Sequence, residues 1–174
     1  VNSVINRDGS IGRAFYLDGP GGTGKTYVYN TVIEQLTQIG LNVLPLAMTG
    51  LAATLLHGGR TVHKAFSLPI NEKIINSTTL KRNTPEGMTM ISADLLIIDE
   101  STLMSATILK SIDNTLRDLM QNREPFGGKT IFMGGDFRQC LPIVPKARRE
   151  RIVGSCLKSS PLWGSFRKLE LTEN

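Results

Sequence analysis

The 174-residue sequence has few of the features that mark disulfide-stapled or membrane-spanning proteins. Its two cysteines, Cys140 and Cys156, are too few for a disulfide scaffold and lack the spacing of metal ligands. One bridge between them is possible in principle, but this cysteine content favours a reduced intracellular protein. The longest apolar runs, such as residues 95–98, are strand-sized and fall far short of the roughly 18 residues of a membrane span. No basic and apolar segments of a signal peptide open the chain, so no membrane partner is expected.

Aromatic residues make up only 6% of the chain and charged residues 20%, beside 40% hydrophobic residues. This composition is typical of a globular protein and excludes a globally disordered, collagen-like or coiled-coil chain. A chain of this length can bury about 70% of its unfolded surface, which is enough for a stable core without disulfide bonds or structural metals. We expect one domain over residues 1–174, and the absence of an initiator methionine suggests a fragment of a longer protein.

The net charge of +5 is unevenly distributed along the chain. Residues 56–83 carry five basic side chains and one acidic one, and residues 138–168 carry eight and one. The rest of the chain is therefore acidic, and the two basic segments form a footprint that a polyanion could use. Charge alone slightly favours the simpler interpretation, which is two solvated surface loops.

Apolar periodicity and glycine or proline breakers predict alternating strands and helices. The predicted strands are residues 14–17, 43–47, 95–98 and 129–133, and the predicted helices are 28–39, 51–56 and the segment from Ser105 to 119. Residues 67–90 are polar and lack a clear period, so we expect an inserted excursion there. Strands that alternate with helices predict an α/β fold with a mostly parallel sheet and helices on both faces, in three layers.

Residues 19–26 read GPGGTGKT and match the phosphate-binding pattern G-x-x-x-x-G-K-[ST] between a predicted strand and a predicted helix. Its glycines would let the backbone turn with positive φ and approach a ligand, and successive N–H groups would form a nest for phosphate. Lys25 would bridge the outer phosphates of the ligand, and Thr26 would hold Mg²⁺. The alternative is a glycine-rich loop with an exposed lysine. The nucleotide-binding residues predicted in this loop are Gly19, Gly21, Gly22, Thr23, Gly24, Lys25 and Thr26.

Two further segments place polar residues at the carboxyl ends of predicted strands, where parallel sheets bind ligands. Asp99 would hold Mg²⁺ through water and Glu100 would deprotonate the attacking water, although acidic residues here could also simply cap a helix. Residues 134–145 read GGDFRQCLPIVP, where Gln139 could sense a γ-phosphate or the attacking water. The alternative for that turn is a polar loop held by bonds from Asp136 to the backbone.

Together these motifs resemble the Pif family of superfamily-one, 5′–3′ DNA helicases, and most of all its Helitron-type branch. The segments that carry the resemblance are GPGGTGKT (19–26), TGLAATLLHGGRTVHKAF (49–66), LLIIDES (95–101), FGGKTIFMGGDFRQCLPIVP (126–145) and SSPLW (159–163). The resemblance implies a P-loop NTPase (RecA-like) fold, of which this chain would be the first of two such domains. It also implies that ATP lies between the two domains, with Lys25, Glu100 and Gln139 as catalytic residues and Asp99 with Thr26 at Mg²⁺.

The same resemblance implies a DNA surface that overlaps the first basic segment, with single-stranded and duplex DNA as partners. Its expected contacts are Thr49, Gly50, Arg60, Thr61, His63, Lys64 and Phe66. A base stacked on Phe66 would gain roughly 1–3 kcal/mol, but a role as a core anchor stays open for this ring. Trp163 is interpreted as part of a packed turn with Leu162 and Phe166. The stretch after Phe66 matches the place of the family's strand-separating wedge.

The sequence departs from the family pattern after Glu100, where Met104 is displaced by about one position relative to the usual spacing. The family's adenine-reading glutamine would fall before Val1, and the chain stops before the arginine that follows Asn174 in the family. The resemblance favours a helicase motor domain in DNA repair, recombination and telomere maintenance, in the nucleus with the mitochondrion as a second location. The alternatives are a non-catalytic remnant of a transposon helicase and a small-molecule P-loop kinase; a GTPase is disfavoured because no N-K-x-D motif is present.

Overall fold

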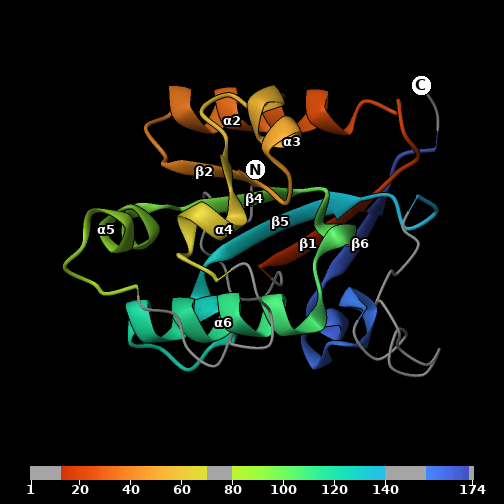
Figure 1. Cartoon of the computed structure of the whole chain (residues 1–174). Helices are drawn as coiled ribbons and strands as arrows, with labels where there is room; N and C mark the ends of the chain where they lie inside the picture. Colours follow the sequence, from red (N-terminus) through yellow and green to blue (C-terminus); the bar gives the residue numbers. More distant parts are fainter. Residues whose placement is uncertain (1–12, 70–79, 140–155, 173–174) are drawn as a thin grey trace.

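The computed structural model describes residues 13–69, 80–139 and 156–172, and its centre is one parallel sheet (Figure 1). The six strands follow the order β3-β2-β4-β5-β1-β6, and every pair of neighbours is parallel. The strands are β1 (Ala14–Asp18), β2 (Val43–Ala47), β3 (Arg60–Thr61), β4 (Leu95–Asp99), β5 (Thr130–Gly135) and β6 (Arg167–Glu170). All carboxyl ends therefore lie at one edge.

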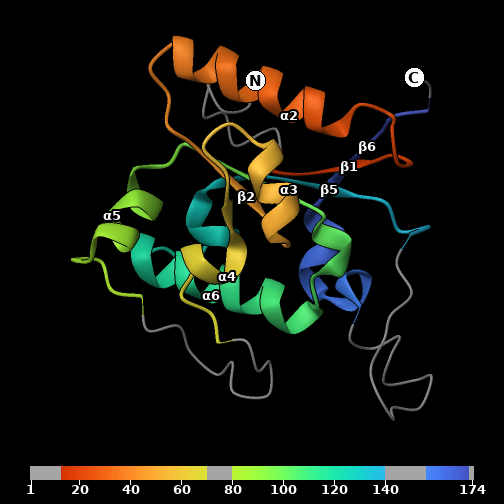
Figure 2. The same ribbon diagram turned by 45° about the horizontal axis from the view of Figure 1, so that its top comes forward.

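Helices cover both faces of this sheet, as Figure 2 shows with α2 on one side and α6 on the other. The helices are α2 (Lys25–Gln38), α3 (Gly50–Leu55), α4 (Val62–Ala65), α5 (Pro85–Ser92) and α6 (Ala106–Met120). Short 3-10 turns are η2 (Ser101–Leu103), η3 (Pro125–Gly128), η4 (Leu157–Ser159) and η5 (Pro161–Ser165). The expected three-layer α/β fold is confirmed.

The central strand β4 is buried along its whole length. Because successive side chains of a strand point to opposite faces, Leu96 and Ile98 join the core under α6, whereas Leu95 and Ile97 join the core under α2. Such burial on both sides explains why the strand is a continuous apolar run. Pro45 pairs with Ile97 of β4, and β3 begins to pair with β2 only at Leu46, so the missing N–H of Pro45 costs no hydrogen bond to β3.

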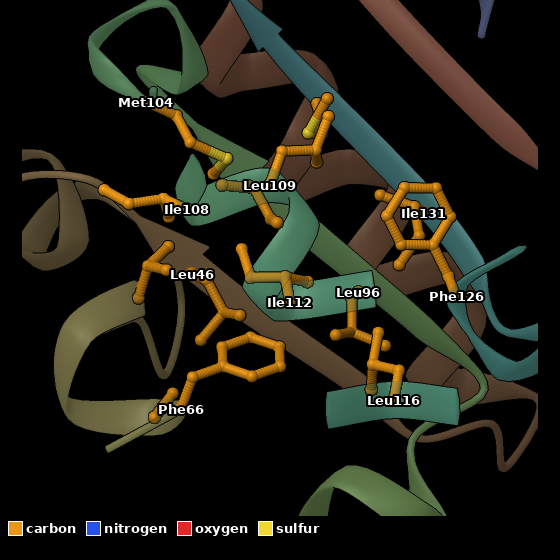
Figure 3. Packing of buried hydrophobic residues seen from close by; sticks show 14 of the residues in the cluster. Leu46, Phe66, Leu96, Met104, Ile108, Leu109, Ile112, Leu116, Phe126 and Ile131 are labelled. Atoms are coloured by element: carbon orange, nitrogen blue, oxygen red, sulfur yellow. The ribbon is translucent and has the colours of Figure 1, made fainter. Parts of the chain in front are cut away.

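The helix α6 closes the larger of the two cores (Figure 3). The Ser105 hydroxyl accepts a hydrogen bond from the Ile108 N–H at 3.2 Å, which confirms the predicted N-cap. The predicted apolar stripe is also confirmed, and its buried members are Ile108, Leu109, Ile112, Leu116 and Leu119. Met104, whose position departs from the family spacing, is buried against this helix and fills the core.

The expectation of an excursion over residues 67–90 is wrong for its last part. Thr84 caps α5 by accepting from the Gly87 N–H at 3.1 Å, and the Met90 side chain is buried in the core. Residues 70–79 lie outside the described residues. The strands β3 and β6 were not predicted either, because β3 has only two residues and β6 is exposed along its whole length, so that neither shows an apolar pattern.

The C-terminal aromatic residues form the packed turn that the sequence predicts. The Trp163 ring lies 4.8 Å from the Tyr16 ring and 5.8 Å from the Phe166 ring, measured between centroids. Cys140, with which the sequence allows Cys156 to form a disulfide, lies outside the described residues. Within the residues that the structure describes, we find no helix of the length and apolarity needed to cross a membrane.

Candidate nucleotide-binding site

Three of the predicted site segments meet at the carboxyl edge of the sheet. The loop 19–26 follows β1, Asp99 and Glu100 end β4, and the turn to Gln139 follows β5. The strands β1 and β4 both pair with β5, which brings these ends together. The Gly19 N–H also donates to the Gly135 carbonyl at 3.4 Å, so the loop is anchored to the end of β5.

The four glycines of the loop serve two different physical needs. Gly22 and Gly24 have φ of 82° and 84°, a left-handed conformation that strains other residues. Gly19 and Gly21 do not have positive φ, which corrects the expectation that all four turn in this way. At these two positions an added side chain would meet a neighbouring side chain: a Cβ at Gly19 would lie 2.7 Å from Thr23 Oγ1, and one at Gly21 would lie 2.5 Å from Gln139 Nε2.

The loop is folded around the Lys25 side chain. Lys25 Nζ donates to the carbonyls of Gly19 at 2.7 Å and Pro20 at 2.9 Å, and Thr23 Oγ1 donates to the same Pro20 carbonyl at 2.8 Å. The helix α2 begins at Lys25 without a side-chain cap, so its first N–H groups are left for a ligand. Thr26 lies half-buried in this first turn.

Asp99 is only 5% exposed at the end of β4, and its Oδ1 accepts the Glu100 N–H at 2.8 Å. Burial raises the pKa of Asp99; the Glu100 N–H and the Lys25 charge lower it, and the Glu100 charge raises it. A buried carboxylate beside a lysine is a suitable partner for a cation. Together with the Thr26 hydroxyl it offers the hard oxygen ligands that Mg²⁺ prefers, so these residues fit the ion.

Protein side chains alone do not form a metal centre in the described part of the chain. Among residues 13–69, 80–139 and 156–172, no group of three or more His, Cys, Asp or Glu side chains is arranged to hold a metal ion. A magnesium ion at Asp99 and Thr26 would therefore take its other ligands from water and from the nucleotide phosphates.

Glu100 is held by a contact that the sequence did not predict. Its backbone is left-handed, with φ of 51°, a conformation that costs a residue other than glycine roughly 1–3 kcal/mol. Its Oε2 accepts a hydrogen bond from Thr49 Oγ1 at 2.6 Å. Thr49 follows β2, and its hydroxyl also accepts from the Ala52 N–H at 3.2 Å as the N-cap of α3.

The turn after β5 combines the two interpretations that the sequence left open. Asp136 is buried, its Oδ1 accepts the Arg138 N–H at 2.9 Å, and its carbonyl accepts the Gln139 N–H at 3.2 Å. The loop is thus held by its own aspartate. The same turn brings the Gln139 amide against Gly21 of the phosphate-binding loop, where it could sense a nucleotide.

Two residues of this edge were missed by the sequence analysis. Tyr29 is fully buried, and its hydroxyl lies where a side chain at Gly134 would be, so only glycine fits there. Burial and the nearby Asp99 charge raise the pKa of Tyr29 well above its usual value. The spacing of Lys25 and Tyr29, one helical turn apart, could have indicated that both side chains lie on the same face of α2.

The second residue is Asp18 at the end of β1. Its carboxylate forms a salt bridge with the Arg138 guanidinium, at 3.2 Å.

The residues expected to contact DNA lie near the carboxyl ends of β2 and β3, at the side of the sheet that these two strands form. Pairing of Ala47 with Thr61 brings the segment after β2, with Thr49 and Gly50, near Arg60 and Thr61. In α4, Lys64 is exposed and His63 half-exposed. The expectation of a base stacked on Phe66 is corrected, because this ring is 0% exposed and belongs to the core shown in Figure 3.

The fold and the site define a RecA-like P-loop NTPase domain. The family model for PIF1-like helicases matches residues 1–174, and the chain belongs to this family.

Curated relatives include the ATP-dependent DNA helicase RRM3 of Saccharomyces cerevisiae, 32% identical over 94% of this chain, and the helicase Pif1 of a Psychrobacter species, 29% identical over 93%. The chain spans only 22% and 25% of those two proteins.

Solved structures of Pif1 helicases have the same fold. Bacteroides Pif1 bound to ssDNA superimposes with a TM-score of 0.76 at 31% identity, covering 92% of this chain and 38% of that one. Bacteroides Pif1 in complex with ADP-AlF3 and ssDNA gives a TM-score of 0.78 at 29% identity, covering 99% of this chain and 42% of that one. Those proteins were thus captured with DNA and with a nucleotide complex.

Proposed function

We propose that this chain is the ATP-binding motor domain of a DNA helicase, in which ATP hydrolysis drives 5′–3′ movement on single-stranded DNA and unwinding of duplex. The observation that carries the proposal is the meeting of Lys25, Asp99–Glu100 and Gln139 at one edge of the sheet. Membership of the PIF1-like helicase family and the resemblance to Pif1 structures that hold ssDNA and ADP-AlF3 support it.

At the nucleotide, each residue is proposed to act through its charge or its hydrogen bonds. Lys25 would leave the Gly19 and Pro20 carbonyls for the outer phosphates of ATP, which are stronger acceptors for an ammonium. Glu100 would take a proton from the attacking water, and Gln139 would orient that water or feel the γ-phosphate. Magnesium, held by Thr26 and Asp99, would neutralise charge on the phosphates.

At the other end of the edge, Thr49, Gly50 and the segment 60–64 are proposed to contact the backbone of one DNA strand. Arg60 and Lys64 are exposed, so their charges are available to phosphates, and neither has a neighbouring carboxylate among the ion pairs of the described residues. His63 can donate to a phosphate without being charged.

The branch of the family, the domain organisation and the biological roles are proposed from the resemblance to the Pif family. We propose that residues 1–174 form the first of two RecA-like domains, of the Helitron-type branch, with the wedge inserted in the stretch that follows Phe66 and ends before α5. The roles would be DNA repair, recombination and telomere maintenance, in the nucleus and secondarily in the mitochondrion. The relatives RRM3 and Pif1 are named as ATP-dependent DNA helicases, which supports a role on DNA.

The test is ATPase activity with and without single-stranded DNA, on this chain and on a chain extended through a second RecA-like domain. The proposal expects weak turnover by this chain alone and strong stimulation of the extended chain by DNA. A non-catalytic remnant of a transposon helicase would bind nucleotide and DNA but show no stimulated turnover in either form. Absence of DNA stimulation in the extended chain would therefore refute the helicase function.

A further inference from the structure

The hydrogen bond between Thr49 and Glu100 joins the two ends of the proposed site. Its length of 2.6 Å is that of a charge-assisted bond from a hydroxyl to a carboxylate. Both partners have assigned roles in the proposed function, one at DNA and one at ATP. A direct bond between them therefore offers a short path by which DNA can act on hydrolysis.

The sheet order tells which way this bond turns the carboxylate. In the order β3-β2-β4-β5-β1-β6, Thr49 follows β2 on one side of β4, and the phosphate-binding loop follows β1 on the other side (Figure 1). Glu100 Oε2 is thus bound on the side of β4 away from the phosphates.

The Thr49 hydroxyl has a single proton, which decides what the residue can do. It now donates that proton to Glu100, while its oxygen accepts the Ala52 N–H. If a phosphate of a DNA strand accepts a hydrogen bond from Thr49, the same proton can no longer serve Glu100. Binding of DNA and holding of Glu100 thus exclude each other at this one atom.

We infer that Thr49 is a positioning residue that holds Glu100 out of its catalytic orientation until a DNA phosphate takes the Thr49 proton. The inference rests on the proposed function and adds the means by which DNA stimulates hydrolysis. Without DNA the carboxylate stays on the β2 side of β4. With DNA it is free to turn to the attacking water.

One substitution removes the donated proton and nearly keeps the shape of the side chain. Thr49→Val loses both the proton and the cap of α3. In the extended chain, it should raise the DNA-free kcat by about tenfold, the scale of one hydrogen bond to a charged group. The KM for ATP should stay unchanged. Thr49→Ser restores the donated proton and should therefore return the DNA-free kcat to a low value.

A matched control separates this effect from loss of a helix cap. Ser105→Ala removes the N-cap of α6, whose hydroxyl accepts from Ile108, and should lower the melting temperature without raising the DNA-free rate. A purely structural role for Thr49 cannot raise kcat. If DNA stimulates the wild-type extended chain but a folded Thr49→Val variant leaves the DNA-free rate unchanged or lower, the inference is wrong. If DNA does not stimulate the wild type, the proposed function itself is wrong.

Discussion

The contact between Gly21 and Gln139 predicts an unusual result for a small substitution in the phosphate-binding loop. In Gly21→Ala the added Cβ would lie 2.5 Å from Gln139 Nε2, whereas ordinary contacts begin at 3.4 Å. The Gln139 side chain must therefore retreat by roughly 1 Å, a displacement that can cost as much as 10²-fold when it affects a positioned group. Because the obstacle is the end of a flexible side chain and Gly21 does not have positive φ, the fold should be almost unaffected.

The assay is a double-mutant cycle on the ATPase activity of the extended chain, using Gly21→Ala, Gln139→Ala and the double variant. If Gly21→Ala acts by displacing Gln139, it should cost activity alone but almost nothing once Gln139 is absent, with a coupling of about 0.5–3 kcal/mol. Gly22→Ala is the matched comparison, since its Cβ meets nothing within 4 Å but its φ of 82° is strained. That variant should lower the melting temperature instead. Equal losses from Gly21→Ala in both backgrounds would refute the reasoning.

The remaining predictions concern charge at the two ends of the edge. Lys25→Ala should lower kcat at least about 10²-fold, measured as ATP turnover, because a group that balances phosphate charge is lost. Glu100→Gln should keep ATP affinity but lower kcat about 10²–10⁴-fold, and equal loss of binding and turnover would argue against a base. The double variant Arg60→Ala with Lys64→Ala should weaken DNA binding on all sequences. The slope of the logarithm of the binding constant against the logarithm of salt concentration should become less steep by up to about two; an unchanged slope would place the DNA elsewhere. Asp99→Asn should raise the melting temperature at pH 7, because a raised pKa means that the ionised carboxylate destabilises the fold as pH rises through it. The increase in melting temperature should shrink in acid, where both the aspartic acid of the wild type and the asparagine of the variant are neutral. An increase that stays constant with pH would contradict this prediction.

The elements that could be predicted from the sequence are those in which buried apolar residues recur at regular spacing along the chain. The run 95–98 and the stripe of α6 are local patterns, and both lie in the core. The strand β6 could not be found in this way, because its residues RKLE are exposed and it is held by backbone pairing with β1, far away in sequence. The helix α5 did carry a signal, since Thr84 before Pro85 is typical of a helix start.

The meeting of the three motif segments at one edge was predictable, but the contacts between their side chains were not. The motifs fix which residues follow which strand, and parallel pairing then brings them to one edge. Neither the bond of Thr49 to Glu100 nor the contact of Gln139 with Gly21 has a sequence signal, because each depends on side-chain directions across neighbouring strands. Phe66 shows the same limit: a single aromatic in a basic segment can be a stacking surface or a core anchor, and packing alone decides.

The place of β4 in the sheet constrains how the proposed motor domain can couple DNA to ATP. The segments proposed to contact DNA follow β2 or lie in β3 and α4, the loop 19–26 follows β1, and β4 and β5 lie between them. Any influence that passes along this edge must therefore cross the end of β4, which carries Asp99 and Glu100. Because β4 is buried on both faces, its backbone has little freedom to move. The side chain of Glu100, which is only partly buried, is then the part of that strand end best able to change its partner.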